Sequence, residues 1–332
     1  MLGPPQGGPF FLRRGFRGPR RGRVPPHWTP RPAGHNGPEG DRPPMTQTLH
    51  LRAETTICEL RPDLGGCITG LWLSGVPVLR SAEHGDVPTA RASGCYPLVP
   101  FSNRVAHATL QWNGTGHPLV RNNAPEPHAI HGIGWQRAWS VLEQSDSFAL
   151  LAHEHRADDA WPFAYDASQS IRVTPGAVEL TLSVTNQSPT PAPMGLGWHP
   201  YFVKRHRSRI AFDATGRWEM GDDKLPTRHL PARGLDGDCA QLDVDHCFDG
   251  WKGVVRLKDE QLRTRITSSL SRLVVFTNDT RDFIAIEPVS HVNNALGVPG
   301  KQPADAEALG VRVLQPGESM SVDMRIEVED VQ

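Results

Sequence analysis

The alternation of apolar and polar residues is the feature that most constrains the fold of this chain. In the clearest segment four apolar residues occupy every second position: Val178, Leu180, Leu182 and Val184. Ile171 and Val173 have the same spacing just before the turn sequence "TPGA". Because successive side chains of a β-strand point to opposite faces, this pattern predicts two half-buried strands. The turn sequence joins them into an antiparallel hairpin.

The C-terminal segment repeats this pattern. Val311 and Val313 precede the turn sequence "QPGES", and apolar residues then occupy every second position over 320–328. We therefore expect a second hairpin here. The segments "RLVVFTN" and "FIAIEP" have contiguous apolar residues, as in strands that are buried on both faces. The segment that starts at Met45, "MTQTLHLRAETTICEL", begins like an edge strand.

No segment has a long helical period, and no repeat of fixed spacing suggests a propeller or a solenoid. A chain of 332 residues is long enough for one large all-β domain or for two ordinary domains. We expect an all-β protein made of two large, packed antiparallel sheets.

Residues 1–44 differ in composition from the rest of the chain. They contain 20 Pro and Gly residues, eight Arg and no Lys. This composition does not bury enough apolar surface to offset the entropy lost on ordering, which predicts a disordered tail. Two alternatives remain open: an arginine-glycine arm that binds RNA or anionic lipid, and a true start at Met45. We therefore expect a tail at 1–44 and a β-domain at 45–332.

The charge distribution argues against nucleic acid as a partner of the β-domain. The whole chain has a net charge of −1, of which the tail carries about +6, so residues 45–332 carry about −7. A domain without a basic face suits a small neutral or polar ligand better than a polyanion.

The cysteines and the hydropathy favour a cytoplasmic protein that does not enter a membrane. The five cysteines are odd in number and form no CxxC pair, which argues against a disulfide framework and against a zinc cage. No apolar run approaches the roughly 18 residues of a membrane span, and the N-terminus lacks the apolar stretch of a secretory signal.

Five short stretches concentrate side chains that suit a sugar-binding site. Each is expected at a strand end or in a loop, where binding groups are usually found. In chain order they are "PFSNRV" (100–105), "HAIHGIGW" (128–135), "GWHPYF" (197–202), "LDVDHCF" (242–248) and "IEPVSHVNNA" (286–295).

Glu287 and His199 are the two candidates for acid and base chemistry. Glu287 ends an apolar strand, and burial there would raise the pKa of its carboxyl above about 4.3, which makes it a better base near neutral pH. The structural alternative is an ion pair with a neighbouring arginine such as Arg281. For His199 the alternative is a core histidine bonded to a backbone carbonyl.

Other polar residues of these stretches also have structural explanations. His128 and His131 have an HxxH spacing, but residues three apart on a strand face opposite ways, so we expect no shared metal. Asp245 could cap a turn, and Arg104 could form a surface ion pair. Four tryptophans suit either the core or stacking on a sugar ring: Trp135, Trp139, Trp161 and Trp198.

Together these stretches resemble the aldose 1-epimerase (galactose mutarotase) family. The resemblance extends from Met45 to the C-terminus and rests on six segments in this order: "PLVPFSNRV", "IHGIGWQRAWSV", "WPFAY", "LTLSVTNQSPTPAPMGLGWHPYF", "LDVDHCFDGW" and "FIAIEPVSHVNNAL". It implies the β-supersandwich fold, no cofactor, and interconversion of the α and β anomers of a free aldose. The "IHGIGW" segment lacks the longer glycine-rich run of better-known galactose mutarotases, so the preferred sugar stays open.

The resemblance also implies roles for individual residues. Glu287 would take the proton of the C1 hydroxyl, and His199 would protonate the ring oxygen, a role that suits an ordinary histidine pKa of about 6.5. The substrate-binding residues would be Asn103, Arg104, His131 and Asp245. Asp243 is the alternative to Asp245, because the stretch "LDVDHCF" holds both.

Three other functions remain open. A mutarotase of hexose 6-phosphates would need cations for the phosphate, for which Arg121, Arg137 and Arg156 are available. A non-catalytic carbohydrate-binding module can have the same fold, because fold does not fix function. An RNA-associated protein would bind through residues 1–44. We expect a monosaccharide as partner and a monomer or homodimer.

Overall fold

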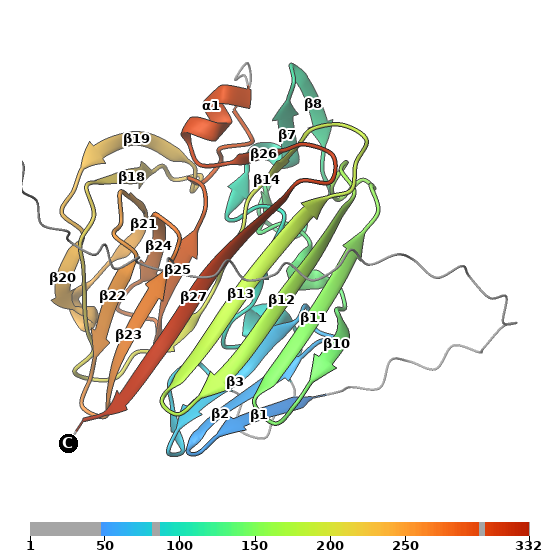
Figure 1. The fold of residues 1–332 in the computed structure, drawn as a ribbon. Helices are drawn as coiled ribbons and strands as arrows, with labels where there is room; N and C mark the ends of the chain where they lie inside the picture. Colours follow the sequence, from blue (N-terminus) through green and yellow to red (C-terminus); the bar gives the residue numbers. More distant parts are fainter. Residues whose placement is uncertain (1–47, 82–86, 299–302, 332) are drawn as a thin grey trace, which may run out of the picture. The chain divides into compact units, whose positions relative to one another are not determined.

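A computed structural model describes residues 48–81, 87–298 and 303–331 of the chain. In these ranges the chain is built almost entirely of β-strands (Figure 1), as the alternation predicted. The expected tail at 1–44 and the alternative start at Met45 lie outside the described residues. None of the helices in the described ranges is both long enough and apolar enough to cross a membrane.

Two large antiparallel sheets form most of the described chain. The larger one has nine strands in the order β10-β11-β12-β13-β27-β23-β22-β17-β20. Its strands are β10 (Ser140–Gln144), β11 (Phe148–His155), β12 (Tyr165–Thr174), β13 (Ala177–Asn186), β27 (Ser319–Asp330), β23 (Leu262–Ser268), β22 (Val254–Lys258), β17 (Arg209–Phe212) and β20 (Leu235–Asp238).

The second sheet has eight strands. Seven follow the order β19-β18-β21-β24-β25-β15-β5, and β16 pairs with β25 beside this path. Its strands are β19 (Pro226–Pro231), β18 (Gly216–Met220), β21 (Val244–Asp249), β24 (Arg272–Thr277), β25 (Phe283–Val289), β15 (Gly197–Trp198), β5 (Pro97–Leu98) and β16 (Tyr201–Val203).

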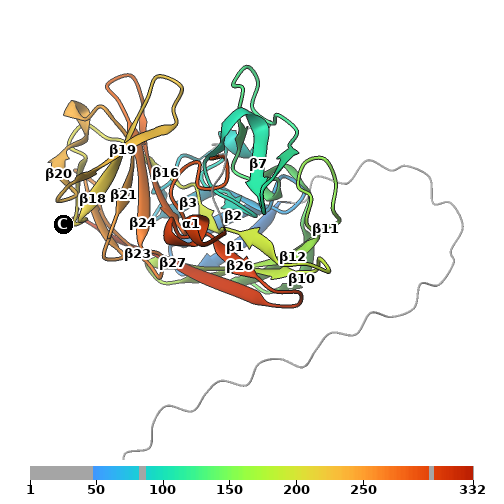
Figure 2. The ribbon, with the colours of Figure 1, turned by 90° about the horizontal axis from the view of Figure 1, so that it is seen from above.

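Smaller sheets and short helices complete the described chain. Strands β1 (Leu49–Ala53), β2 (Thr56–Arg61), β3 (Cys67–Leu73) and β4 (Val76–Pro77) form a four-stranded sheet with β1 at its edge, as expected. Three strand pairs are β6 (Arg104–Val105) with β9 (Ala129–Ile130), β7 (Thr109–Trp112) with β8 (Thr115–Pro118), and β14 (Ala192–Met194) with β26 (Arg312–Leu314). The helices are η1 (Ala90–Ala92), η2 (Ala106–Ala108), η3 (Gly134–Gln136), η4 (Cys239–Gln241) and α1 (Pro303–Ala308). Seen from above, β18, β21 and β24 lie on one side of α1 and β7 on the other (Figure 2).

The first predicted hairpin is confirmed. Strands β12 and β13 pair in antiparallel register, with Ile171 opposite Leu180 and Val173 opposite Val178. The strands "RLVVFTN" and "FIAIEP" are confirmed as β24 and β25, which pair with each other, and every residue of β25 is buried.

The predicted C-terminal hairpin is wrong. The segment before "QPGES" forms β26, which pairs with β14 and not with β27. Both edges of β27 are hydrogen-bonded to other strands, β13 along 319–327 and β23 along 324–330. Local alternation identifies a strand but not its partner, and here the partners come from distant parts of the chain.

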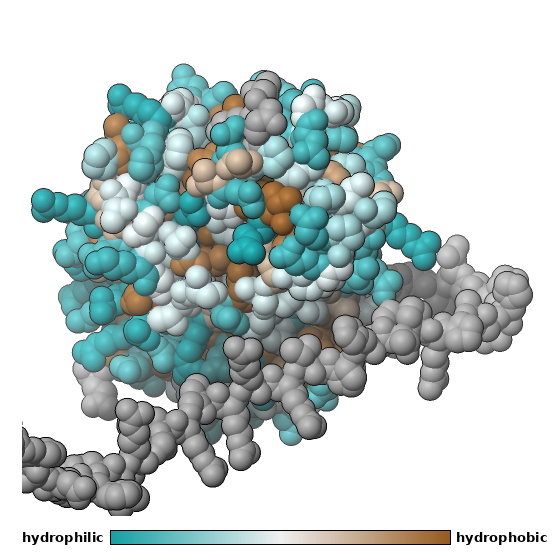
Figure 3. Space-filling model, turned by 45° about the horizontal axis from the view of Figure 1, so that its top comes forward, coloured by the Kyte–Doolittle hydropathy of each residue, from teal (hydrophilic) through white to brown (hydrophobic). Residues whose placement is uncertain are grey.

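The buried apolar side chains form one large cluster and one smaller cluster. All four tryptophans considered for sugar stacking are buried: Trp135, Trp139, Trp161 and Trp198. The five cysteines are also buried and unpaired. Most side chains on the face shown in Figure 3 are polar, with apolar residues gathered near its centre. Among described residues, the large apolar side chains with high exposure are Val120 and Leu142.

A buried histidine ties the end of β25 to the loop that carries Asn103. The Nε2 atom of His291 accepts a hydrogen bond of 3.1 Å from the amide of Ser102. Its Nδ1 lies 2.8 Å from the carbonyl oxygen of Val292, to which it donates. Burial lowers the pKa of His291 to about 4, so the ring is neutral at neutral pH and can accept from Ser102.

This arrangement predicts acid sensitivity. The folded state takes up a proton at His291 only near pH 4, whereas the unfolded chain does so near pH 6.5. The free energy of unfolding should therefore fall as pH decreases from about 6.5 to about 4, by up to roughly 3 kcal/mol from this residue. Urea unfolding at several pH values should show a shallower pH dependence in His291→Gln than in the wild type. The exposed His206→Gln should keep the wild-type slope, and an unchanged slope in His291→Gln would contradict the assignment.

Candidate active site

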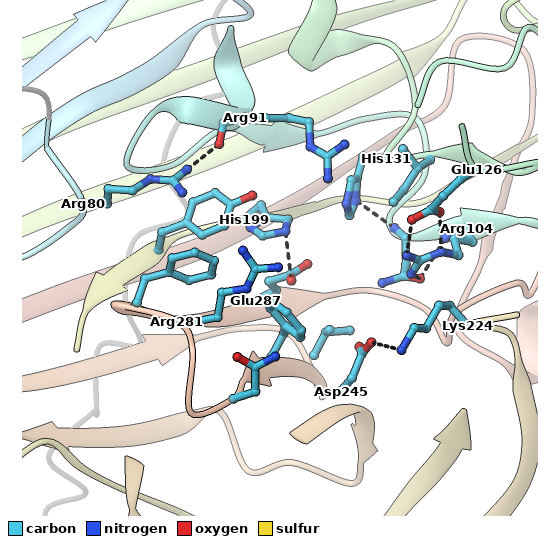
Figure 4. A pocket seen from close by; sticks show the side chains of 17 residues that line it. Arg80, Arg91, Arg104, Glu126, His131, His199, Lys224, Asp245, Arg281 and Glu287 are labelled. Carbon is cyan, nitrogen blue, oxygen red and sulfur yellow. Dashed lines mark hydrogen bonds and ion pairs between the residues drawn. The ribbon is translucent and has the colours of Figure 1, made fainter. Parts of the chain in front are cut away.

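All five sequence stretches contribute side chains to one cavity of about 500 Å³ (Figure 4). All six residues proposed as catalytic or substrate-binding line it: Asn103, Arg104, His131, His199, Asp245 and Glu287. Among the described residues, Asp243 does not line this cavity, so the geometry favours Asp245 over Asp243. The four buried tryptophans do not line it either.

Glu287 and His199 are in direct contact on the wall of this cavity. The Oε1 atom of Glu287 lies 3.1 Å from Nε2 of His199, and the side chains are only 3% and 10% exposed. Oε2 of Glu287 and Nδ1 of His199 are buried without a hydrogen-bond partner. Glu287 pairs with His199 and not with Arg281, the ion-pair partner considered from the sequence.

The backbone on both sides holds His199 in place. Strand β15, just before it, pairs with β25 on one side and with β5 on the other. The amide of His199 donates to the carbonyl oxygen of Tyr96 at 3.0 Å. Its ring stacks on Tyr96 with a centroid distance of 4.9 Å and lies 4.3 Å from the ring of Tyr201. The ring is therefore fixed by packing, and its Nε2 has Glu287 as partner in place of a backbone carbonyl.

Burial shifts the two pKa values toward the neutral forms. Burial, followed by the charge of Asp245, raises the pKa of Glu287 well above its ordinary value. Burial, followed by the charges of Arg91 and Arg80, lowers the pKa of His199 well below 6.5. The sequence argument used the ordinary histidine value. In the structure the proton between the two groups favours the carboxyl.

His131 faces the same cavity through a strained turn. Its Nδ1 accepts from the amide of Asn103 at 3.1 Å, and its own amide donates to the carbonyl of Asn103 at 2.9 Å. Both residues have positive φ, 53° for Asn103 and 61° for His131, which costs energy in residues with side chains. Burial lowers the pKa of His131 well below 6.5, so the neutral ring carries its proton on Nε2 and presents a donor.

His128 does not join His131. Its Nδ1 accepts from the amide of His107 at 3.0 Å, and its Nε2 lies 3.0 Å from the carbonyl oxygen of Asp223. The two ring nitrogens of His128 therefore have partners other than His131. A different set, His131, His199 and Glu287, offers three ligand atoms within 4.8 Å of one another. These atom types suit a zinc ion, which would occupy the same lone pairs as the acid and base chemistry.

The structure also reveals residues that the sequence argument missed. Arg104 forms two hydrogen bonds of 2.9 Å with the carboxylate of Glu126, so only part of its guanidinium faces the cavity freely. Lys224 lies 3.7 Å from Asp245. Three more arginines line the cavity: Arg80, Arg91 and Arg281. They come from separate segments of the chain, and no short motif marks them.

The arginines considered for a phosphate are elsewhere. Among the described residues, the lining of this cavity does not include Arg121, Arg137 or Arg156. Arg137 lies 3.6 Å from Asp158, and Arg121 and Arg156 are exposed.

Fold and site define an all-β protein with a buried carboxyl–imidazole pair in a polar cavity. Comparison with known proteins gives its family. A profile of the aldose 1-epimerase family matches residues 48–327. The chain is 32% identical over 284 residues to YphB of Escherichia coli K12, a protein of uncharacterised function, and the match covers 80% of this chain and 94% of YphB.

Solved structures agree with this match. One is a structure from Escherichia coli K12 that is provisionally named an aldose 1-epimerase. It superposes on this chain with a TM-score of 0.77 at 28% sequence identity, and the match covers 86% of this chain and 100% of that chain. A galactose mutarotase-like protein from Clostridium acetobutylicum has a TM-score of 0.74 at 18% identity, with 86% and 96% covered. The β-supersandwich fold is thereby confirmed. The chain belongs to the aldose 1-epimerase family.

The strained turn at His131 gives a prediction. Gly132 has φ of +68°, and a Cβ there would lie 2.2 Å from the carbonyl oxygen of Val99. Gly114 has a similar φ of +73° but open space around it. Gly132→Ala should lower the free energy of unfolding by clearly more than the roughly 1 kcal/mol expected from backbone strain alone, which Gly114→Ala should show. Denaturant titration of both variants measures the difference, and equal losses would contradict the close packing of this turn.

Proposed function

We propose that this protein is an aldose 1-epimerase that interconverts the α and β anomers of an aldose by acid–base ring opening. The observation that carries the proposal is the 3.1 Å contact between Glu287 Oε1 and His199 Nε2 on the wall of a polar cavity. Family membership supports it.

The chemistry needs one base and one acid at neighbouring oxygens. The hydroxyl oxygen on C1 and the ring oxygen are bonded to the same carbon and lie closer together than hydrogen-bonded atoms do. A carboxylate and an imidazolium that lie side by side can therefore contact both oxygens at once. Glu287 takes the proton of the C1 hydroxyl while His199 gives a proton to the ring oxygen, and the bond between C1 and the ring oxygen breaks.

Ring closure reverses these transfers. The product of ring opening is an open-chain aldehyde with a protonated carboxyl and a neutral imidazole. Rotation about the C1–C2 bond presents the other face of the carbonyl, and the protons return as the ring closes. Carboxylate with imidazolium, and carboxyl with imidazole, hold the same number of protons. Burial favours carboxyl with imidazole, and moving one proton across the contact gives the working pair of carboxylate and imidazolium.

The neighbouring groups can orient a polyol. Nε2 of His131 is a donor close to His199, whose ring centroid lies 5.1 Å from that of His131. Asp245 offers a carboxylate that accepts from hydroxyls, and Arg104 offers the N–H groups that Glu126 leaves unused. Donors and acceptors are both needed, since each hydroxyl gives and receives hydrogen bonds.

A non-catalytic carbohydrate-binding module is the competing function. Burying a carboxyl with one unpartnered oxygen costs stability. A protein that only binds sugar needs acceptors for hydroxyls, but it has no need of a carboxyl and an imidazole that share a proton. The buried pair therefore favours the enzyme. We further propose a reducing compartment such as the cytoplasm, because all five cysteines are unpaired.

Polarimetry tests the proposed function. Freshly dissolved α-D-glucose, α-D-galactose or L-arabinose should reach its equilibrium rotation faster with the protein than without it. Glu287→Gln should lower the catalysed rate by roughly a hundred- to ten-thousand-fold, because the amide cannot accept the proton.

Asp243→Asn is the matched control, since Asp243 lies outside the cavity lining, and it should keep the wild-type rate. Calorimetry could instead show that the protein binds sugars while polarimetry shows no faster anomer interconversion, both for these sugars and for the anionic sugars considered below. That result would favour the carbohydrate-binding module.

A further inference from the structure

Three arginines form a cluster at one end of the cavity. Arg80 follows β4, Arg91 lies in η1, and Arg281 lies between β24 and β25. Figure 4 shows this arginine cluster (Arg80, Arg91 and Arg281) around His199, while Arg104 and the other cavity cation lie apart from it.

The charges at the two ends of the cavity differ in how they are balanced. Away from His199, Arg104 is paired with Glu126 at 2.9 Å and Lys224 with Asp245 at 3.7 Å. Arg80, Arg91 and Arg281 differ from these two cations. In the described part of the chain, no carboxylate lies within ion-pair distance of any of the three. Three like charges beside one another repel, so an anion between them would be favourable.

Neutral groups hold Arg80 rigidly in this position. Its Nη2 and Nε donate to the carbonyl oxygen of Ser93 at 2.8 and 3.1 Å, and Nη2 also donates to the carbonyl oxygen of Arg91. The guanidinium lies 3.8 Å from the ring centroid of Tyr201 and 5.2 Å from that of Phe283. These contacts fix the group without cancelling its charge.

The other two arginines are held in the same way. Nη1 of Arg91 donates to the side-chain oxygen of Asn123. The guanidinium of Arg281 lies 5.7 Å from the ring of Phe276 and 5.8 Å from the ring of Phe283. Arg80 and Arg281 therefore both lie near the ring of Phe283, and all three cations retain N–H groups for a ligand.

The position of the cluster relative to the acid–base pair indicates where the anion belongs on the sugar. The ring of Tyr201 contacts both His199, at 4.3 Å, and Arg80, at 3.8 Å, so the cluster lies on the His199 side. In the proposed reaction His199 contacts the ring oxygen. The carbon bonded to the ring oxygen on the side away from C1 is C5, which carries C6.

We propose that the substrate is an aldose with an anionic group at C6, a phosphate, a carboxylate or a sulfonate, which Arg80, Arg91 and Arg281 bind. This inference rests on the proposed function, because the acid–base pair defines the orientation of the sugar. It assigns the anion to arginines other than Arg121, Arg137 and Arg156. Guanidinium groups suit all three anions, because each presents several oxygens to their N–H donors.

The test compares matched sugars with the full chain. NMR exchange spectroscopy measures anomer interconversion of D-glucose 6-phosphate, D-glucuronate and D-glucose at several protein concentrations, which separates catalysed from spontaneous exchange. We expect kcat/KM for at least one anionic sugar to exceed that for glucose by about tenfold or more, through a lower KM. The order of kcat/KM for the phosphate and the carboxylate sugar shows which anion is preferred. Glucose with a sulfonate at C6 tests the third anion in the same way.

Variants connect this preference to the cluster. Arg80→Gln and Arg281→Gln should each reduce the ratio of kcat/KM for the anionic sugar to that for glucose by about tenfold. Arg156→Gln removes an exposed arginine outside the cavity and should leave the ratio unchanged. High salt should reduce the ratio as well, because it screens the partly exposed cations.

Binding separates the two proposals. Calorimetry with Glu287→Gln measures affinity without turnover, and the preferred anionic sugar should bind about tenfold more tightly than glucose. Catalysis with no preference for any anionic sugar, or a ratio unchanged in Arg80→Gln and Arg281→Gln, would overturn the anion site and leave the proposed function standing. Tight, cluster-dependent binding of an anionic sugar without catalysis would overturn the function and retain the site.

Discussion

The contact between Glu287 and His199 is the interaction on which the site depends. It joins a carboxyl and an imidazole that are both almost fully buried, 3.1 Å apart. Burial alone would leave each group neutral and inert, but in contact they can exchange one proton without exchanging any with solvent. The rest of the fold supplies the geometry. Strand β25 carries Glu287, and the pairing of β15 with β25 and β5 places His199 beside it.

Part of this arrangement could be predicted from the sequence. The buried strand before Glu287 is visible as a run of apolar residues, and the hairpin of β12 and β13 is visible as alternation. The resemblance to a family identified six site residues that no local pattern relates to one another. All six line one cavity. These features depend on residues close in the sequence or on several short motifs together.

The features that escaped prediction depend on distant contacts. Three examples are the pairing of Arg104 with Glu126, the arginine cluster, and the pairing of β26 with β14. Each joins segments that are distant in the sequence, and no local sequence pattern shows that these segments are close in space. The pKa of His199 is a further example. Its direction follows from burial and from the charges of Arg91 and Arg80, so the ordinary value assumed for an isolated histidine did not apply.

The position of β27 has a consequence for how the protein is made. This strand lies between β13 and β23 and so joins the two halves of the nine-stranded sheet. It is formed by Ser319–Asp330, later in the sequence than every other strand of that sheet. While the ribosome is still making the chain, β13 and β23 each have an edge without a partner, and unpaired edges favour aggregation. The two halves of the sheet can therefore join only after the segment Ser319–Asp330 has been made.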